Sequence, residues 1–445
     1  MDSLVVEIKE KELSKIFDEL FPICRSILGD GFRDSLDIMS NYIPFERYNV
    51  PSGTKIFDWT VPDEWHIKEA YIIGPDGKKY ADFKDNNLSV VNYSCSINKI
   101  LDFEELKKNI HTLKNLQDAV PYVTSYYNKN WGFCIPYKVY KNMPRGNYTV
   151  KIDSTFKSGS LTYGEYLLKG KSKEEVLITS YLCHPSLANN ELSGPLSMIK
   201  LYQKLKNKID RYYSYRFLIV PETIGTLCFL KKNYKYLQKN LLCGLVLTCV
   251  GGPSNKISFK KAKDDKTRLN KLIDYIKEYN IIDINIRDFK PEGSDERQYN
   301  SPGINLPVGQ IARTVYGNYK EYHNSLDNKE FMNIAQVIKS TNDIYKIITC
   351  IDFSGIYKNL FPFGEPQLGK RDLYPSINNQ LSREKFSNDN IKNSRNFLDI
   401  LRYILAYSDT KHDIVDIAKI SNINLLEFKN VIDVLIKKKL IERLS

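Results

Sequence analysis

Apolar and polar residues alternate between two patterns in the central part of the chain. Between about residue 160 and residue 355, short apolar runs typical of buried strands are followed by longer segments with apolar positions at helical spacing. The predicted strands are residues 176–182, 216–221 and 243–250, and the predicted helices are residues 194–207, 224–239, 267–279 and 328–351. Strands that alternate with helices predict an α/β fold, in which a mixed central sheet is sandwiched by helices.

Two more helices are predicted near the N-terminus. Apolar positions recur at helical spacing in residues 8–22 and 33–43, and Gly29-Asp30-Gly31 marks a turn between them. We expect both helices to belong to the α/β domain, which would then consist of residues 1–44 and 160–360.

Residues 45–159 predict an inserted, mostly β domain. Short alternating runs with turn signals begin near residue 45, and Pro75-Asp76-Gly77 marks a hairpin. Short alternating runs also occur in residues 122–131 and 147–166. The aromatic residues of this segment offer Tyr126 and Trp131 as candidates for substrate binding, although aromatic side chains of a small β domain more commonly form its core.

Residues 375–445 predict a winged-helix domain. Helical segments at 396–407 and 413–421 are followed by a polar break and a further helix from 425, whose end resembles the start of a wing. DNA contact requires basic side chains at the start of the second helix, but residues 424–429 read Asn-Leu-Leu-Glu-Phe-Lys. We therefore expect this domain to contact protein or to mediate oligomerisation, with DNA as the less favoured partner.

The composition is that of a globular protein with two or three domains. The 445 residues are 42% hydrophobic and 27% charged, and the N-terminal sequence lacks a signal peptide. No apolar run reaches the roughly twenty residues that span a bilayer, so we expect a cytoplasmic protein without membrane contact. The net charge of +12 comes from scattered Lys residues, which favours a solvated surface over a nucleic-acid site. The eight Cys form no C-x-x-C pair, which excludes a zinc knuckle.

Two of the five His residues are candidates for chemistry. His184 and His323 each lie in a loop predicted to leave the sheet, near carboxylates or amides, and a neutral imidazole is a common transition-metal ligand. Glu222 directly follows the strand at 216–221, where a carboxylate can act as a general base. The alternative is that Glu222 caps the following helix.

A dense group of charged residues follows Gly293. Asp295, Glu296 and Arg297 are candidates for binding a substrate terminus or a ligand carboxylate. The alternative is a solvated surface loop.

Four motifs in this order resemble a known clan of proteins. CHPSLANNELSGP, PETIGT, GSDERQYNSPGINLPVG and EYHNSLDN resemble the zinc aminopeptidase clan, which also contains carboxypeptidases and glutaminyl cyclases. They are more closely similar to a bacterial family of aminopeptidase-like proteins with an inserted β domain and a C-terminal winged helix, some of which are linked to polysaccharide biosynthesis. The resemblance covers nearly the whole chain. It implies an aminopeptidase-like fold with the site at the strand ends.

The resemblance transfers only some of the clan's metal ligands. It implies that His323 is the final metal ligand and that Glu222 is the general base. Neutral residues replace the clan's other ligands. Asn189 stands at the position of the metal-bridging Asp, Thr223 and Thr248 at those of two acidic ligands, and Tyr181 and Cys183 in the first His-x-Asp motif, with His184 just beyond it.

These replacements predict a remodelled site. We expect about one zinc ion, held by His184 and His323 with Glu222 or Asp295, or no metal at all. The expected activity is hydrolysis of an amide, either at a peptide N-terminus or in an aminoacyl or amino-sugar substrate. The residues expected to bind the substrate are Asn189, Asn190, Glu191, Asp295, Glu296, Arg297, Tyr126 and Trp131. The alternatives are a non-catalytic binding or regulatory protein on an aminopeptidase scaffold, and a DNA-binding regulator.

Overall fold

The computed structural model describes residues 8–208, 211–374 and 396–444. The chain divides into two compact units, one within residues 1–270 and 283–345 and the other within 271–282 and 346–445. Residues 375–395, with which the predicted winged-helix domain begins, lie outside the described residues, as do residues 1–7 of the predicted α/β domain. The predicted domain boundaries stay a prediction.

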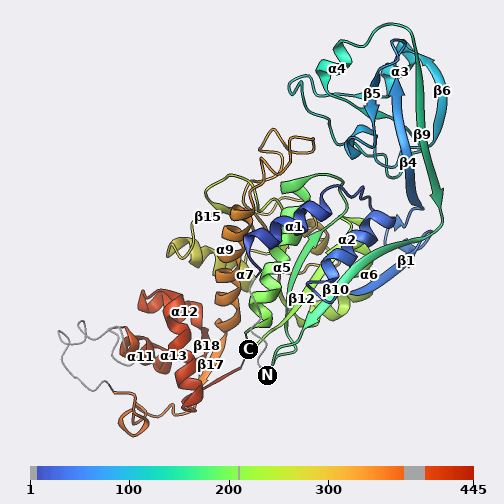
Figure 1. Cartoon of the computed structure of the whole chain (residues 1–445). Coiled ribbons are helices and arrows are strands. Elements are labelled where there is room, and N and C mark those ends of the chain that lie inside the picture. Colours follow the sequence, from blue (N-terminus) through green and yellow to red (C-terminus); the bar gives the residue numbers. More distant parts are fainter. Residues whose placement is uncertain (1–7, 209–210, 375–395, 445) are drawn as a thin grey trace. The chain divides into compact units, whose positions relative to one another are not determined.

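A mixed sheet of eight strands forms the centre of the first unit within the described residues (Figure 1). In spatial order the strands are β1 (Glu46–Pro51), β10 (Ser160–Leu168), β12 (Ser214–Val220), β11 (Glu175–Tyr181), β13 (Leu241–Leu247), β16 (Val308–Ala312), β14 (Ile257–Lys260) and β15 (Ile284–Arg287). The four strands β12, β11, β13 and β16 run parallel, so their carboxyl ends meet at one edge. The predicted mixed central sheet is confirmed.

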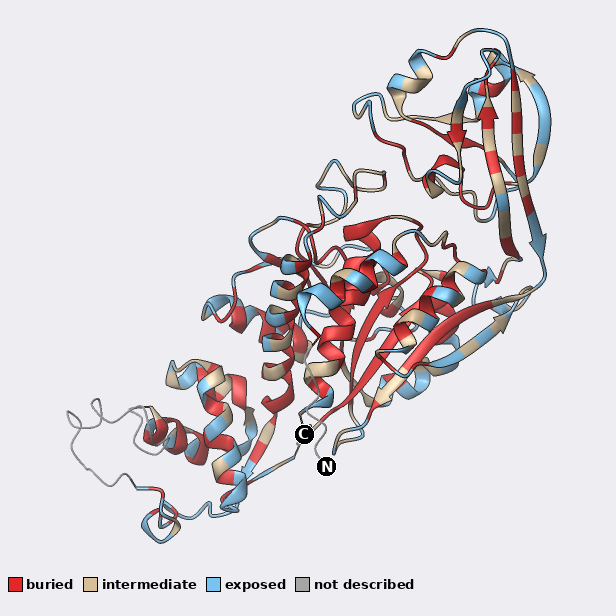
Figure 2. Cartoon of the chain, viewed as in Figure 1, coloured by how far each residue is buried: buried red, intermediate tan, exposed pale blue. Residues whose placement is uncertain are grey.

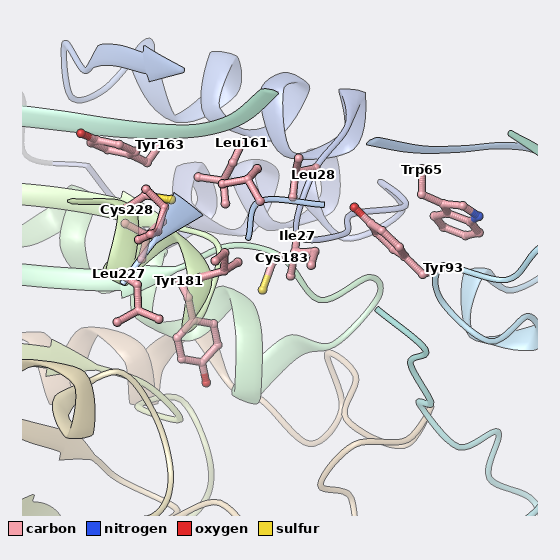
Figure 3. Close-up of a cluster of buried hydrophobic side chains, with 14 of the residues drawn as sticks. Ile27, Leu28, Trp65, Tyr93, Leu161, Tyr163, Tyr181, Cys183, Leu227 and Cys228 are labelled. Atoms are coloured by element: carbon pink, nitrogen blue, oxygen red, sulfur yellow. The ribbon is translucent and has the colours of Figure 1, made fainter. Parts of the chain in front are cut away.

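Helices pack on both faces of this sheet. They are α2 (Asp30–Ser40), α5 (Ser193–Lys206), α6 (Ile224–Asn240) and α8 (Glu296–Tyr299), with α1 (Glu10–Leu20) against α2 and α5. Two further helices, α7 (Arg268–Glu278) and α9 (Ile334–Phe353), are divided between the two units. Alternate residues of a strand point to opposite faces. Ser180 of β11 therefore meets Gly194 of α5, while Leu177 and Tyr181 share a buried cluster with Leu227 of α6. Figure 3 shows part of that cluster.

Two predicted helices begin elsewhere than expected. The helix predicted at 33–43 begins at Asp30, because Gly29 alone, with φ of 126°, makes the turn before it. The helix predicted at 328–351 begins only at Ile334. Before it, the Asn328 side chain accepts the N–H of Glu330, and that of Asn333 accepts the N–H of Ala335, which are bonds typical of turns and helix starts.

A second, four-stranded sheet lies within residues 64–157. Its spatial order is β5 (Lys79–Asp82), β4 (Glu64–Ile73), β9 (Asn147–Lys157) and β6 (Ile97–Asp102). The shorter elements between β1 and β9 are β2 (Lys55–Ile56), β3 (Trp59–Thr60), η1 (Asn87–Ser89), α3 (Phe103–Leu106), η2 (Lys107–Asn109), β7 (Ile110–His111), β8 (Phe133–Cys134) and α4 (Tyr137–Lys141). The hairpin predicted at Pro75-Asp76-Gly77 joins β4 to β5, with Gly77 at φ of 77°.

Two parts of the predicted inserted domain differ from expectation. β1 pairs with β10 in the main sheet, although it lies within residues 45–159. Residues 122–131 form no strand; instead the Tyr122 N–H donates to the His323 carbonyl at 2.8 Å, and Val123 accepts the N–H of Asn92. The backbone hydrogen bonds of this segment are therefore made with loops, and one of these loops carries His323.

The second unit contains the winged helix. Its elements are β17 (Ile356–Asn359), η4 (Gly369–Arg371), α11 (Phe397–Tyr407), β18 (Asp409–Asp413), α12 (Ile414–Ser421), α13 (Leu425–Lys437) and β19 (Ile441–Arg443). A capping box at Asp413 and Asp416 starts α12, and β17 pairs with both β18 and β19. The first turn of α13 carries the acidic Glu427 rather than a basic residue.

Among the described residues, no helix combines the length and the apolar character needed to cross a membrane.

The loop after β11 is held tightly on the main sheet. A π-helical turn, η3 (Ala188–Leu192), leads directly into α5, and both are buried (Figure 2). Asp327 accepts the N–H of Asn189 at 2.6 Å and that of Asn190 at 2.9 Å. Burial is the main reason why the pKa of Asp327 is raised to about 7, and these backbone N–H groups oppose the rise. Asp327 therefore fixes the turn that carries Glu191.

We expect Gly194→Ala to destabilise the protein by about 1–3 kcal/mol through overpacking. A Cβ at this position would lie 2.3 Å from Ser180 Oγ and 2.5 Å from the Leu247 carbonyl oxygen. Replacing Gly by Ala inside a helix would otherwise stabilise it by up to about 1 kcal/mol. Urea unfolding measures the change. The control is Gly303→Ala, where a Cβ meets nothing within 4 Å. An unfolding midpoint for Gly194→Ala at or above the wild-type value would contradict the close packing.

We also expect Asp327 to make the protein less stable at high pH. The unfolded carboxyl loses its proton near pH 4, but the folded one keeps it until about pH 7, so the folded state binds more protons in between. The resulting stability is fully present below about pH 4 and is lost as the pH rises through about 7. Asp327→Asn cannot titrate, so its free energy of unfolding should fall by a few kcal/mol less than that of the wild type between pH 5 and pH 8.

The substitution also removes one acceptor, so at pH 5 the variant should be less stable by about 1–3 kcal/mol. Urea unfolding at both pH values tests this. The exposed Asp265→Asn serves as the control and should keep the wild-type pH dependence. If Asp327→Asn kept it too, the carboxyl would not titrate as inferred.

Candidate active site

The ends of three parallel strands bring the predicted site residues together. β11 runs into Cys183 and His184, β12 into Pro221 and Glu222, and β13 into Thr248. Since the carboxyl ends of parallel strands share one edge of the sheet, loops that are distant in the sequence meet there.

His184 is held in one orientation by Glu191. The Glu191 carboxylate accepts the His184 main-chain N–H at 2.9 Å and contacts the ring Nδ1 at 2.5 Å. Both side chains are buried. Burial alone would lower the pKa of His184, but neighbouring acidic groups, Glu191 among them, raise it above its usual value. The ring therefore turns Nε2 away from Glu191, and this atom lies 3.7 Å from Glu222 Oε2.

The Glu222 side chain lies next to Nε2 of the His184 ring. Its Oε1 accepts a hydrogen bond from Ser294 Oγ at 2.8 Å, and its main-chain N–H donates to Cys183 Sγ at 3.3 Å. Burial raises the pKa of Glu222 above its usual value, and the charge of His184 opposes the rise. The Glu222 side chain contacts Ser294 and His184, and the N-cap of α6 is the next residue, Thr223, whose side chain makes no capping hydrogen bond.

His323 completes this group through ring contacts. Its ring centre lies 5.4 Å from that of His184, and Tyr122 packs edge-on against both rings, at 5.1 Å from His184 and 5.2 Å from His323. Burial, helped by the charge of His184, lowers the pKa of His323 to about 3. His323 is therefore a neutral imidazole at physiological pH.

Cys183, His184 and Glu191 place ligand atoms within 4.8 Å of one another, which makes them a geometric candidate for a metal site. Their chemistry fits an ion poorly. Both oxygens of Glu191 already contact His184, and burial raises the pKa of Cys183 to about 11, so its thiol keeps the proton that a metal would have to displace. This trio is better explained as the support that orients His184.

Neutral residues fill the positions where the resemblance implies further ligands. The Tyr181 hydroxyl lies 2.5 Å from Thr248 Oγ1 and 3.4 Å from Asn190 Oδ1. Asn189 Oδ1 accepts the Gly251 N–H at 2.9 Å. These groups use one another or the backbone as partners and carry no negative charge. They fit a multi-metal cage poorly.

Asp295 and Glu296 are fully buried, so the alternative of a solvated surface loop is wrong. Asp295 Oδ1 accepts the Thr223 N–H at 2.7 Å, and burial raises the pKa of Asp295 well above its usual value. Glu296 pairs with the buried Lys260 and accepts a hydrogen bond from the Gln310 side chain at 2.9 Å. Arg297 donates to Thr223 Oγ1 at 3.1 Å.

These contacts support an unusual backbone conformation. Thr223 has φ of 66°, which is rare for a β-branched residue. Asp295 and Arg297 both bind Thr223, so they hold the turn that presents Glu222. Their predicted roles in binding metal or substrate stay predictions.

The two predicted aromatic residues are placed differently. The Tyr126 hydroxyl lies 2.6 Å from that of Tyr122, next to the two His rings. Trp131 lines a separate cavity together with Asn98 and Lys151 of the four-stranded sheet. The structure therefore links Tyr126, through Tyr122, to His184 and His323, and gives no such link for Trp131.

Three residues at the site were missed in the sequence. Arg25 is fully buried and donates from Nε to the His184 carbonyl at 2.9 Å. Tyr122 packs against His184, and Ser294 donates a hydrogen bond to Glu222. Arg25 lies 159 positions from His184, and nothing in its local sequence indicates the contact. Ser294 adjoins the predicted Asp295 cluster, which was the one available signal.

The comparisons with known proteins agree with this fold. A Clostridium acetobutylicum protein, provisionally named as a polysaccharide biosynthesis protein with an aminopeptidase-like domain, is 41% identical over 433 residues, covering 97% of this chain and 96% of that protein. The crystal structure of a provisionally assigned peptidase from Clostridium acetobutylicum matches with a TM-score of 0.86 and 40% identity, covering 98% and 96% of the two chains. A zinc aminopeptidase from Bacillus subtilis matches with a TM-score of 0.55 and 11% identity, covering 76% and 93%, which shows a common fold alone.

The family models divide the chain between two descriptions. Residues 355–443 match a winged helix-turn-helix, so the predicted winged helix is confirmed. The predicted aminopeptidase-like fold is confirmed by the structural neighbours. Residues 14–354 match the family described as a domain of unknown function (DUF4910). The chain therefore belongs to this family, whose aminopeptidase-like fold it shares.

Proposed function

We propose that the protein is a zinc-dependent hydrolase of amides, with a single metal site. The proposal is carried by two distances: His184 Nε2 lies 3.7 Å from Glu222 Oε2, and the His323 ring centre lies 5.4 Å from that of His184. Glu191 fixes the His184 ring from behind. A carboxylate that holds the second nitrogen of an imidazole is the usual support of a metal-binding His.

The donor set fits zinc. Two imidazoles and a carboxylate are ligands that catalytic zinc uses with a water in an open position. His323 is already neutral, and His184 would have to release a proton on binding. When bound, zinc would supply Lewis acidity to the scissile carbonyl and to the attacking water.

Glu222 is the proposed proton carrier. Its raised pKa brings the carboxylate closer to neutral pH, where it can take a proton from the attacking water and later give one to the leaving amine. Ser294 donates a hydrogen bond to Oε1 of the carboxylate, and the other oxygen, Oε2, is directed at His184.

Asn190 supports substrate binding at the same place. Its side-chain Nδ2 is buried and has no hydrogen-bond partner among the described residues, while its Oδ1 is near the Tyr181 hydroxyl. A buried amide donor costs stability unless an acceptor meets it. We infer that a carbonyl or hydroxyl oxygen of the substrate takes this position. The Clostridium relative is named as a polysaccharide biosynthesis protein, and on this basis we propose an aminoacyl or amino-sugar amide as the substrate class.

A second candidate is a binding protein that has kept the scaffold without turnover. The observation that favours it is that Tyr181 and Thr248, at two implied ligand positions, are neutral and bonded to one another, with Asn190 Oδ1 next to the Tyr181 hydroxyl. In this case the site would bind an amide compound without metal. The winged helix would then transmit binding to a protein partner.

We expect Glu222→Gln to lower hydrolysis of an aminoacyl-amide panel by about 10²–10⁴-fold, because the amide cannot accept the proton. Release of the amine from aminoacyl p-nitroanilides and aminoacyl-hexosamines measures the rate. The fold should be unchanged. The assay is run with zinc in excess, so that the metal site stays occupied although the amide is a weaker ligand than the carboxylate. The exposed Glu330→Gln serves as the control and should keep wild-type rates. Full activity in Glu222→Gln would remove Glu222 from the mechanism.

We expect about one zinc per chain after dialysis against zinc, and Glu191→Gln to weaken zinc binding by roughly 10–100-fold, because the His184 ring loses its charged support. Competition with a chromophoric chelator measures affinity and elemental analysis measures the content. His412→Ala is the control, since His412 contacts only Asp409 among the acidic residues described. No bound zinc in the wild type, even after zinc addition, would favour the binding-protein alternative.

A further inference from the structure

A cavity lies at the four-stranded sheet, outside the candidate active site and distinct from the one that Trp131 lines. Its volume is about 720 Å³, within the range of small-molecule sites, about 300–1,000 Å³. It lies where β4 and β6 begin and β9 ends, and the loop 125–129 closes one side. Figure 1 shows these three strands side by side. All of its lining residues belong to the segment 60–156.

Aromatic rings form the walls of this cavity. Tyr93 lies at the bottom with 2% of its surface exposed, and it meets Tyr126 and Phe156 edge-on at 5.3 Å and 5.8 Å. Tyr127 and Phe156 are 51% and 41% exposed, and Trp59 packs against Tyr127 at 5.4 Å. These rings adjoin one another around a single cavity, which distinguishes them from exposed aromatic residues that stand singly on a surface.

Polar groups surround these rings. The hydroxyls of Ser125 and Ser154 donate to the backbone, at 3.0 Å and 2.7 Å, so their oxygens can still accept hydrogen bonds. At the rim, the side chains of Asp63, Asn128 and Lys129 make no hydrogen bond or ion pair with any residue that the structure describes. The rim thus offers donors and acceptors with balanced charge.

We propose that this cavity binds a saccharide. A pyranose ring has apolar C–H faces that pack on aromatic rings, and hydroxyls around its edge that need both donors and acceptors. The cavity offers both kinds of surface. A phosphorylated ligand would require a concentration of positive charge, whereas the lining has one Lys beside one Asp. An acyl chain would require walls without hydroxyls.

The cavity is connected to the candidate active site through two hydroxyls. Tyr126 lines the cavity, and its hydroxyl lies 2.6 Å from that of Tyr122, whose ring packs on His184 and His323. The saccharide proposal goes beyond hydrolysis and does not require it, because binding in the cavity uses none of the residues proposed for zinc or proton transfer.

The test is titration calorimetry of the full-length protein with N,N′-diacetylchitobiose and with cellobiose, in buffer with a chelator so that zinc plays no part. We expect saturable binding of at least one disaccharide and no binding of decanoate or of the dipeptide Leu-Gly. Tyr127→Ala and Phe156→Ala should each weaken the binding on the order of tenfold, because each removes one stacking face. Both residues are exposed, so the variants should fold.

Phe57→Ala is the matched control. Phe57 is also aromatic and 44% exposed, but it packs on Tyr234 and does not line the cavity. It should bind the disaccharide within twofold of the wild type. Binding of decanoate or Leu-Gly alone, no disaccharide binding up to about 10 mM, or equal loss in all three variants would each overturn the proposal. The chelator makes this outcome independent of the hydrolase proposal.

Discussion

The Glu191 carboxylate accepts the main-chain N–H of His184 and contacts its ring Nδ1, and the orientation of the His184 ring depends on these two contacts. They form because the loop 182–187 leads from β11 into η3, which is fixed on the sheet. Asp327 binds the N–H groups of η3, and Gly194 lets α5 approach β11 and β13 closely. The orientation of one imidazole thus depends on packing that reaches across the central sheet.

The charge of the site explains how it differs from the clan that it resembles. Tyr181, Thr248 and Asn189 are neutral; the Tyr181 and Thr248 hydroxyls bond to one another, and Asn189 Oδ1 accepts a main-chain N–H. A cluster of carboxylates in this buried place would need cations to offset its repulsion and its lost hydration. These neutral side chains create no such requirement. What remains is a smaller group of donors, His184, Glu222 and His323.

The segment between β1 and β9 contributes directly to this site. Tyr122 donates its N–H to the His323 carbonyl, and Val120 accepts the N–H of Ser325 while its own N–H donates to the Ser325 hydroxyl. These bonds hold the loop of His323 and place the Tyr122 ring against both imidazoles. The same segment forms the aromatic cavity. One stretch of chain therefore contributes to both the candidate active site and the aromatic cavity.

The sequence by itself determined the elements and the edge at which they meet. Apolar runs such as 176–182 and 216–221 identify buried strands, and their polar ends identify Cys183, His184 and Glu222, because the period of the pattern and the parallel order of strands are local properties. The starts of α2 and α9 were misjudged, since single side chains at Asn328 and Asn333 and one left-handed Gly29 decide them. The winged helix followed from the same helical periodicity.

Only the tertiary structure decided which polar side chains face one another. Nothing in the local sequence links Arg25 to His184 or Tyr122 to His323, because these contacts join segments more than 150 residues apart. Burial also places Asp295, for which a solvated surface loop was the alternative, inside the protein, where it accepts the N–H of Thr223. Residue type and spacing show which groups could react. Their protonation, orientation and partners depend on desolvation and on contacts that exist only after the chain has folded.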